Sequence, residues 1–311
     1  MFTRTTARTS IVAASIALAL GVAGCSSTDS SDASTSEGAP TLANGDLATI
    51  SIGVHSGWDE GIAVSHLFKT ILEDEGYTVE TTEADAGVVF TGLTGGDFDV
   101  NFDMWLPVTH ADYLTEYGDE MEQLGAWYDD AKLTIAVNED SPATSLADLA
   151  ANADAYGNRL VGIEAGAGLT RITQDEVIPT YELEGMDYVI SSTPAMLAEL
   201  KGATAAGKDV AVTLWRPHWA YDEFPVRDLE DPENALGDAE EINSVGRLGF
   251  AADYPTLASW ISAFTLDDEQ LFSLENLMFN ENGGSDNEAS AREWLEQNPT
   301  FVDDLKAAAD A

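Results

Sequence analysis

The feature that most constrains the fold is an alternation of short apolar strands and helices that starts near residue 48. Apolar residues alternate with others over 50–54, as in a strand, and recur at helical spacing over 64–72. Further strands are predicted at 98–104, 160–163 and 210–214. A helix is predicted over 112–124, after the first of these. Strands that alternate with helices predict an α/β fold with mostly parallel sheets covered on both faces.

Breaks in this pattern place the boundaries between larger units. A strand predicted over 133–137 is followed by the polar run at 138–142, which ends in proline. A lobe boundary is therefore predicted near residue 138, because polar and proline-containing runs interrupt strands. A second break falls at 231–237, and residues 260–309 have a mostly helical composition.

The N-terminus has the features of a secretory signal peptide. Arginines precede an apolar run over 11–22, which ends in small residues before Cys25, so 1–24 is predicted to be removed. Residues 22–25 resemble the lipobox of bacterial lipoproteins, which implies lipidation of Cys25 and stable membrane anchoring. Residues 25–46 are then a lipidated cysteine and a flexible tether. The alternative is a stray cysteine beside an ordinary cleavage site.

The charge of the chain limits its partners. Lys and Arg number 13 against 56 Asp and Glu, a formal net charge of -43 that is spread along the sequence. Nucleic acid and anionic lipid headgroups would be repelled, so neither is expected as a partner. Membrane contact is expected through the lipid anchor only. Nothing in the sequence requires an oligomer, and a monomer is expected.

Candidate binding residues lie in four loops, because ligands of α/β proteins bind outside the carboxyl ends of the strands. These loops are residues 55–58, 105–110, 164–169 and 215–219. Three of them place a tryptophan, Trp58, Trp105 or Trp215, at or just beyond the end of a predicted strand. An exposed indole is costly unless it meets another group. The alternative is that each tryptophan packs in the core or between lobes.

Indole rings in one place favour a particular ligand chemistry. The face of an indole carries negative potential, and several faces around one volume attract a cation that cannot donate hydrogen bonds. A trimethylammonium group is such a cation. A carboxylate would also accept Na⁺, K⁺ and protonated amines, whereas an aromatic cage prefers a large, weakly hydrated cation. The tryptophans therefore predict a site for a quaternary ammonium compound.

A glycine-rich loop supplies a candidate anion site. Residues 166–170 read Gly-Ala-Gly-Leu-Thr and can present backbone N–H groups at the start of a helix, where a ligand carboxylate could bind. A dinucleotide site is a poor fit, because Arg171 stands where the third glycine of the GxGxxG motif should be. The loop could also be a simple turn between strand and helix.

Four stretches together resemble the glycine betaine-binding proteins of ABC transporters. They are 58–60 (WDE), 103–110 (DMWLPVTH), 162–169 (GIEAGAGL) and 215–219 (WRPHW). The resemblance spans 49–255, in the lobe order of the unpermuted members, and implies a periplasmic-binding-protein type 2 fold with a ligand cleft between two lobes. It implies lobes over 47–138 plus 241–311 and over 139–240.

The resemblance also implies a set of binding residues, three indoles that form a cage and three groups that hold a carboxylate. They are Trp58, Trp105 and Trp215, with His110 and the backbone amides of Gly168 and Leu169. Ala165 stands where the family usually has proline. His218 could contact the ligand or brace its own turn through a hydrogen bond, and Arg216 is a reserve candidate for the carboxylate.

The expected function is capture of glycine betaine, or of a related quaternary-ammonium compatible solute, outside the cell membrane for an ABC permease. Choline, carnitine or another onium compound are alternatives. No cofactor, metal or catalytic residue is expected. A secreted lipoprotein hydrolase is the alternative of another class, but there is no GxSxG motif and the four histidines lack metal-site spacing. A structural or adhesive lipoprotein is a third reading.

Overall fold

The computed structural model describes residues 49–311. The predicted signal peptide, lipidated Cys25 and tether fall at 1–46 and so lie outside the described residues. Among the residues that are described, none of the helices combines the length and the apolar character needed to cross a bilayer.

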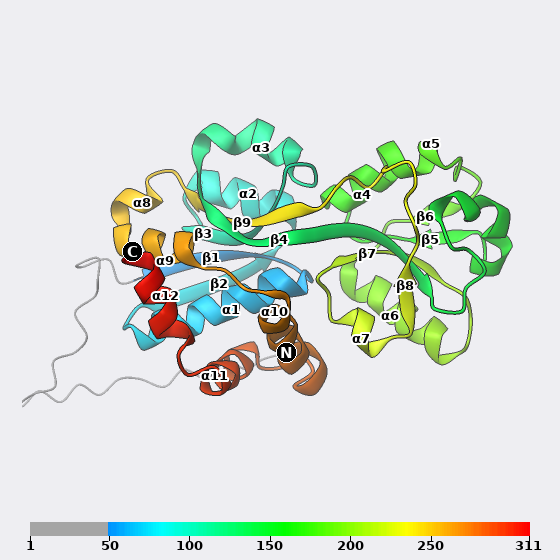
Figure 1. Ribbon diagram of the computed structural model, residues 1–311. Coiled ribbons are helices and arrows are strands. Elements are labelled where there is room, and N and C mark those ends of the chain that lie inside the picture. Colours follow the sequence, from blue (N-terminus) through cyan, green and yellow to red (C-terminus); the bar gives the residue numbers. More distant parts are fainter. Residues whose placement is uncertain (1–48) are drawn as a thin grey trace, which may run out of the picture. The chain divides into compact units, whose positions relative to one another are not determined.

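The first βα unit forms as predicted. The chain opens with β1 (Thr49–His55), α1 (Asp59–Asp74), β2 (Thr78–Ala84), α2 (Ala86–Gly95) and β3 (Val100–Leu106). Nearly every position of β1 and β3 is buried or half-buried, as expected of strands covered on both faces. Figure 1 shows α1 and α2 on opposite sides of these strands.

The helix predicted over 112–124 is wrong in its second half. Only α3 (Ala111–Tyr117) is an α-helix, and it is followed by a short 3₁₀ turn at Gly118–Glu120. The chain then enters β4 (Met121–Asn138), which includes the strand predicted over 133–137. Pairing with β9 (Glu240–Arg247) overrides the local helical pattern, because it buries apolar residues of β4 against a strand more than 100 residues away.

The second half of the chain repeats the α/β pattern with shorter elements. Between β4 and β9 lie 3₁₀ turns at Leu146–Asp148 and Ala150–Tyr156, β5 (Arg159–Val161), α4 (Gly168–Ile172), a π turn at Thr173–Val177, α5 (Ile178–Thr180), β6 (Asp187–Val189), α6 (Thr193–Ala205), β7 (Ala211–Arg216), α7 (Ala220–Glu223) and β8 (Val226–Asp228). After β9 come α8 (Phe250–Asp253), α9 (Pro255–Ala263), α10 (Asp268–Glu275), a π turn at Asn276–Glu281, α11 (Asn287–Gln297) and α12 (Phe301–Ala309). The helical composition of 260–309 thus corresponds to helices.

The strands form one hydrogen-bonded path in the order β2-β1-β3-β9-β4-β7-β5-β6, with β8 also paired to β4. The strands at each end of this path pair in parallel with their neighbours, whereas every pairing of β9 and β4 is antiparallel. β4 pairs with β9 through 121–131 and with β7 through 132–137. The prediction of a mixed α/β fold is confirmed.

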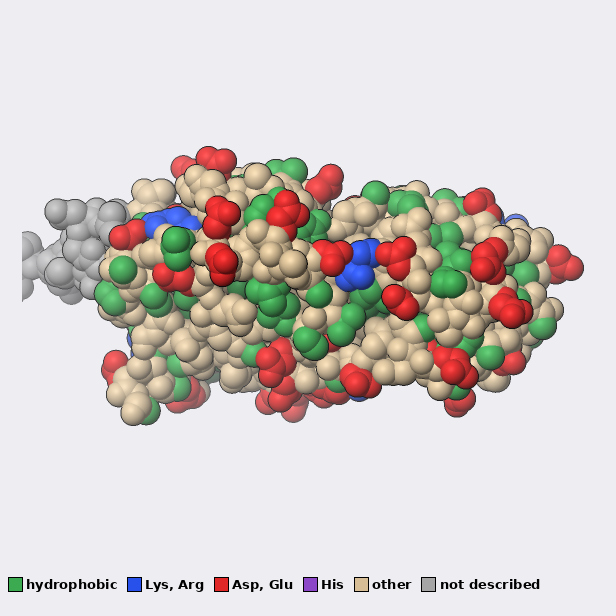
Figure 2. All heavy atoms as spheres, turned by 90° about the horizontal axis from the view of Figure 1, so that it is seen from above, with side chains coloured by type: hydrophobic (Ala, Val, Ile, Leu, Met, Phe, Trp, Pro, Cys, Tyr) green, Lys and Arg blue, Asp and Glu red, His purple; other side chains and the backbone are tan. Residues whose placement is uncertain are grey.

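Two lobes share β4 (Figure 1). We call β1–β3 and β9 with α1–α3 and α8–α12 the first lobe, and β5–β8 with α4–α7 the second lobe. In the first lobe, Phe68 of α1 stacks on Phe102 of β3 with ring centroids 4.4 Å apart, and both rings are fully buried. Asp and Glu side chains are scattered over the face seen in Figure 2, with few Lys or Arg between them.

Candidate ligand-binding site

The four loops expected from the sequence meet at one small cavity, where the carboxyl ends of β1, β3 and β7 face the start of α4. The empty space is about 290 Å³, part of it open to solvent. Its lining comprises Trp58, Glu60, Trp105, Thr109, His110, Leu133, Ile163, Ala167, Gly168, Leu169 and Trp215. All six residues of the expected binding set are among them, contributed by both lobes.

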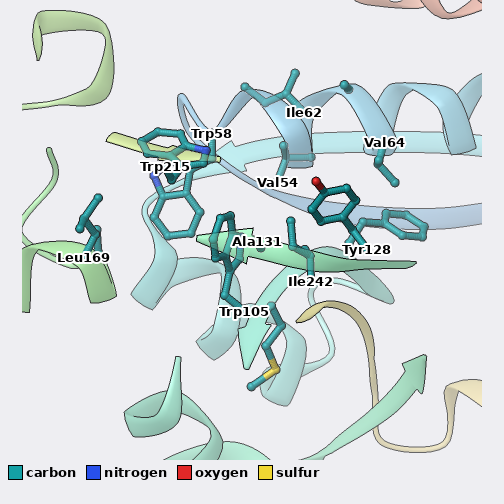
Figure 3. Packing of buried hydrophobic residues seen from close by; sticks show 14 of the residues in the cluster. Val54, Trp58, Ile62, Val64, Trp105, Tyr128, Ala131, Leu169, Trp215 and Ile242 are labelled. Atoms are coloured by element: carbon teal, nitrogen blue, oxygen red, sulfur yellow. The ribbon is translucent and has the colours of Figure 1, made fainter. Parts of the chain in front are cut away.

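The three tryptophans are buried but border this empty space. Their exposed fractions are 7% for Trp58 and 3% each for Trp105 and Trp215. Figure 3 shows the three indoles grouped together, with Leu169 on the α4 side. They also belong to the continuous apolar core, so the core interpretation and the cage interpretation are compatible. Like Ile163 and Leu169, which also belong to the core, each of them borders the cavity.

Buried carboxyl groups fix the indoles of two of the three tryptophans that line the cavity. Trp105 Nε1 donates to Asp103 Oδ1 at 2.8 Å, and Trp215 Nε1 donates to Glu60 Oε2 at 2.9 Å, across the lobes. Each bond ties down the polar edge of a ring and so restricts its orientation. Sequence reasoning missed Glu60 as a lining residue. Its signal was its place in the stretch 58–60 (WDE), although the chain contains 56 acidic residues from which to choose.

The acidic groups behind the cage have strongly raised pKa values. Burial raises the pKa of Glu60 well above its usual range, and the nearby charges of Asp103 and Glu275 raise it further. Burial also raises the pKa of Asp103 to about 7, although the bond from Trp105 opposes this rise. Burial disfavours the charged form, and two neighbouring carboxylates disfavour it again.

His110 presents a hydrogen-bond donor that has no acceptor. Its Nδ1 accepts the backbone N–H of Trp105 at 2.9 Å, so in the neutral ring the proton resides on Nε2. Nε2 is buried and has no partner among the described residues. Burial lowers the pKa of His110 well below its ordinary value, and the nearby His55 and Arg171 lower it further. A neutral donor is thus available to an anionic ligand group.

The loop that carries His110 is held by Glu240 at the start of β9. The Glu240 carboxylate accepts the backbone N–H groups of Val108 and Thr109 at 2.7 and 2.9 Å, and also the Thr109 hydroxyl. Glu240 is 132 residues from Val108 in sequence, so no local motif could have identified it. It is a positioning residue that sequence reasoning missed.

The glycine loop lies against the first lobe. α4 begins at Gly168, and the first N–H groups of a helix have no acceptor within it. A Cβ added to Gly168 would lie 2.0 Å from the carbonyl oxygen of Thr109. Around this contact, Tyr113 donates to the Gly166 carbonyl at 3.0 Å and Arg171 pairs with Asp112 at 2.9 Å. The two lobes are therefore closed over the cavity, and only glycine fits at 168.

The two lower-ranked candidates do not line the cavity. Arg216 pairs with Asp228 at 2.7 Å and stacks over Tyr221, with its guanidinium carbon 3.5 Å from the ring centroid. His218 packs edge-on against Trp215 at a centroid distance of 4.7 Å, and its Nδ1 accepts the backbone N–H of Ala220. His218 thus braces the turn that presents Trp215. Among residues 49–311, no group of His, Cys, Asp and Glu could hold a metal ion.

Comparisons with known proteins define the class as two-lobed ligand-binding proteins of transporters. The glycine betaine/L-proline-binding protein ProX of Borrelia burgdorferi has a TM-score of 0.77 and 25% identity, over 84% of this chain and 99% of that one. Lactococcal OpuAC, closed on glycine betaine, has a TM-score of 0.75 and 26% identity, over 83% and 98%. The glycine betaine/carnitine transport binding protein GbuC of Listeria monocytogenes is 34% identical over 148 residues. That match covers 46% of this chain and 47% of GbuC, about half the length of the relative.

The amino-acid sequence matches one protein family over most of its length. The OpuAC family, described as the substrate-binding domain of ABC-type glycine betaine transport systems, matches residues 48–297. The chain belongs to this family. The family and these structural neighbours are transport substrate-binding proteins and not enzymes, so the hydrolase alternative is not favoured.

The contact at Gly168 predicts a substitution that blocks closure. Gly168→Ala should weaken ligand binding tenfold or more, about 1.4 kcal/mol, because its methyl group would overlap the Thr109 carbonyl only when the lobes are closed. The melting temperature of the ligand-free protein should change little. Gly202→Ala is the matched control, since nothing lies within 4 Å of its added Cβ. Wild-type affinity in Gly168→Ala, measured by calorimetry, would contradict this account of the closed cleft.

Proposed function

We propose that this protein captures glycine betaine, or a related quaternary-ammonium compatible solute, as the extracytoplasmic component of an ABC importer. The observation that carries the proposal is the combination of groups at one closed cavity. Three indoles border it together with Glu60. His110, whose Nε2–H has no partner among the described residues, also lines it. A methylated cation and a carboxylate on one small molecule would satisfy both kinds of group.

Micromolar affinity requires contacts to both the methylated cation and the carboxylate of the ligand. Three desolvated cation–π contacts of about 2 kcal/mol each give roughly 6 kcal/mol. Micromolar binding needs about 8.2 kcal/mol, and closure of the lobes has its own cost. Capture of the carboxylate by His110 and by the amides of Gly168 and Leu169 supplies the difference. Glu60 also lines the cavity, where its carboxyl group accepts the Trp215 indole N–H.

Similar proteins support the same ligand class without fixing the compound. The lactococcal structure contains glycine betaine, and the Listeria protein is named for glycine betaine and carnitine. Choline, carnitine and other onium compounds are therefore the alternatives to glycine betaine. Titration calorimetry with a panel of these solutes tests the proposal, and it fails if none of them binds.

The proposal includes a location and partners. Residues 1–24 act as a signal peptide, Cys25 carries the lipid anchor, and 25–46 tether the folded part to the outer face of the cell membrane. The binding protein works as a monomer and delivers its ligand to the ABC permease of the same transporter. Its lobes are 47–138 plus 241–311 and 139–240. Metabolic labelling with a fatty acid tests the anchor, since the Cys25→Ala variant should not incorporate the label.

Loss of one cage wall should weaken binding of every onium ligand. Trp105→Ala removes an indole from the cavity and should weaken glycine betaine binding tenfold or more, about 1.4 kcal/mol. Circular dichroism and the melting temperature of the ligand-free variant show whether it remains folded. Unchanged affinity in a folded variant would count against the cage.

The role of His110 predicts a difference between two ligands. His110→Ala removes the free Nε2–H donor, so it should weaken glycine betaine binding more than choline binding, because choline has no carboxylate. Any loss of packing affects both ligands and cancels in the ratio of their dissociation constants. Equal losses for the two ligands, measured by calorimetry, would refute this role.

A further inference from the structure

The motif at 215–219 contains a second tryptophan, Trp219, which the binding site does not use. Trp219 precedes α7 in the second lobe, and its Nε1 donates to Asp59 Oδ2 in the first turn of α1. Neither residue lines the cavity. Asp59 is buried, with 9% of its surface exposed, and Trp219 is half-buried. The contact is thus a largely buried hydrogen bond between lobes, outside the ligand site.

A second acidic residue of the first lobe lies near this contact. Glu275, the last residue of α10, is buried near Asp59 and the backbone of Trp219. Burial raises the pKa of Asp59 to about 7, and the bond from Trp219 opposes this rise. His218 Nε2 lies 4.0 Å from Asp59 Oδ2 and has no hydrogen-bond partner among the described residues. We call Asp59, Glu275 and Trp219 the outer clasp.

The outer clasp continues a contact that begins inside the cavity. Glu60 and Trp215 form the inner bond between the same two segments, and both of these residues line the cavity. Asp59 is one residue before Glu60, and Trp219 is four residues after Trp215. The inner bond can therefore respond to the ligand, whereas the outer one depends only on whether the lobes are closed.

The ion pair between Arg171 and Asp112, another contact between the lobes, is more exposed than the outer clasp. The side chains of Arg171 and Asp112 are 33% and 71% exposed, and such surface ion pairs contribute little because water and salt screen them. A buried hydrogen bond to a carboxyl group is stronger and more costly to leave unmade. Opening of the lobes would expose the clasp groups to water, so their bonds stabilise the closed form specifically.

We propose that Asp59 and Trp219 are positioning residues that hold the lobes closed and so set how long any ligand stays bound. The choice of ligands in this test rests on the proposed function, whereas the contact between Asp59 and Trp219 does not depend on it. Trp219→Phe keeps an aromatic ring and removes the N–H donor. It should raise the dissociation rates of glycine betaine and choline by the same factor, about tenfold, and leave association rates nearly unchanged.

Matched variants separate closure from general stability. Trp294→Phe removes another buried indole donor, whose bond to Ser273 Oγ at 2.8 Å joins α11 to α10 within the first lobe, and should leave dissociation rates at the wild-type value. Asp59→Asn retains an acceptor oxygen and should keep dissociation slow, whereas Asp59→Leu should behave like Trp219→Phe. Stopped-flow measurements of tryptophan fluorescence give these rates.

Several results would overturn the clasp. One is a wild-type dissociation rate in Trp219→Phe. Another is a changed ratio between the two ligands, which would mean that Trp219 touches the ligand. A third is an equal increase in the dissociation rates of Trp294→Phe.

Small-angle scattering of the ligand-free protein provides a test that needs no ligand. The Trp219→Phe variant should have a larger radius of gyration than the wild type and the Trp294→Phe variant. An equal radius would overturn the clasp. If wild type binds no onium compound, the proposed function fails and scattering still decides the clasp.

Discussion

Closure of two lobes over one small space is the interaction on which the rest of the site depends. The first lobe contributes Trp58, Trp105 and His110, and the second contributes Gly168, Leu169 and Trp215. A methylated cation offers no hydrogen-bonding group, so its binding requires several aromatic faces and the exclusion of water. Neither lobe alone supplies enough faces or excludes water from the space. A bound ligand therefore favours the closed form, because only that form makes all the contacts.

Buried carboxyl groups give the closed form its specific geometry. Most of the acidic residues that produce the charge of -43 lie on or near the surface, but Asp59, Glu60, Asp103 and Glu275 are buried. Their burial is costly for the charged form, and it raises the pKa of each group. Indole and backbone N–H groups offset that cost. The same bonds orient the cage and join the lobes, so ligand recognition and closure use one set of buried polar contacts.

The sequence was a good guide to local elements and a poor one to long-range pairing. The strand at β1 and the helix at α1 follow from periodicity within a few residues. The predicted helix at 112–124 failed because β4 starts at Met121, where pairing with β9 decides the conformation. Glu240 shows the same limit in the site, since it fixes the His110 loop from 132 residues away. Local patterns carry no record of a partner at that distance.

The sequence by itself determined the α/β class and the residue types that line the proposed binding site, because strand ends are marked by periodicity and an indole at a strand end is chemically unusual. Only the tertiary structure decided how those residues face one another. It showed that His110 Nδ1 accepts a hydrogen bond while Nε2 has no partner among residues 49–311. It also showed that Glu60 lines the cavity and that Trp219 bonds to Asp59 across the lobes. Hydrogen-bond direction and burial depend on atoms brought together by folding, and no spacing along the chain specifies them.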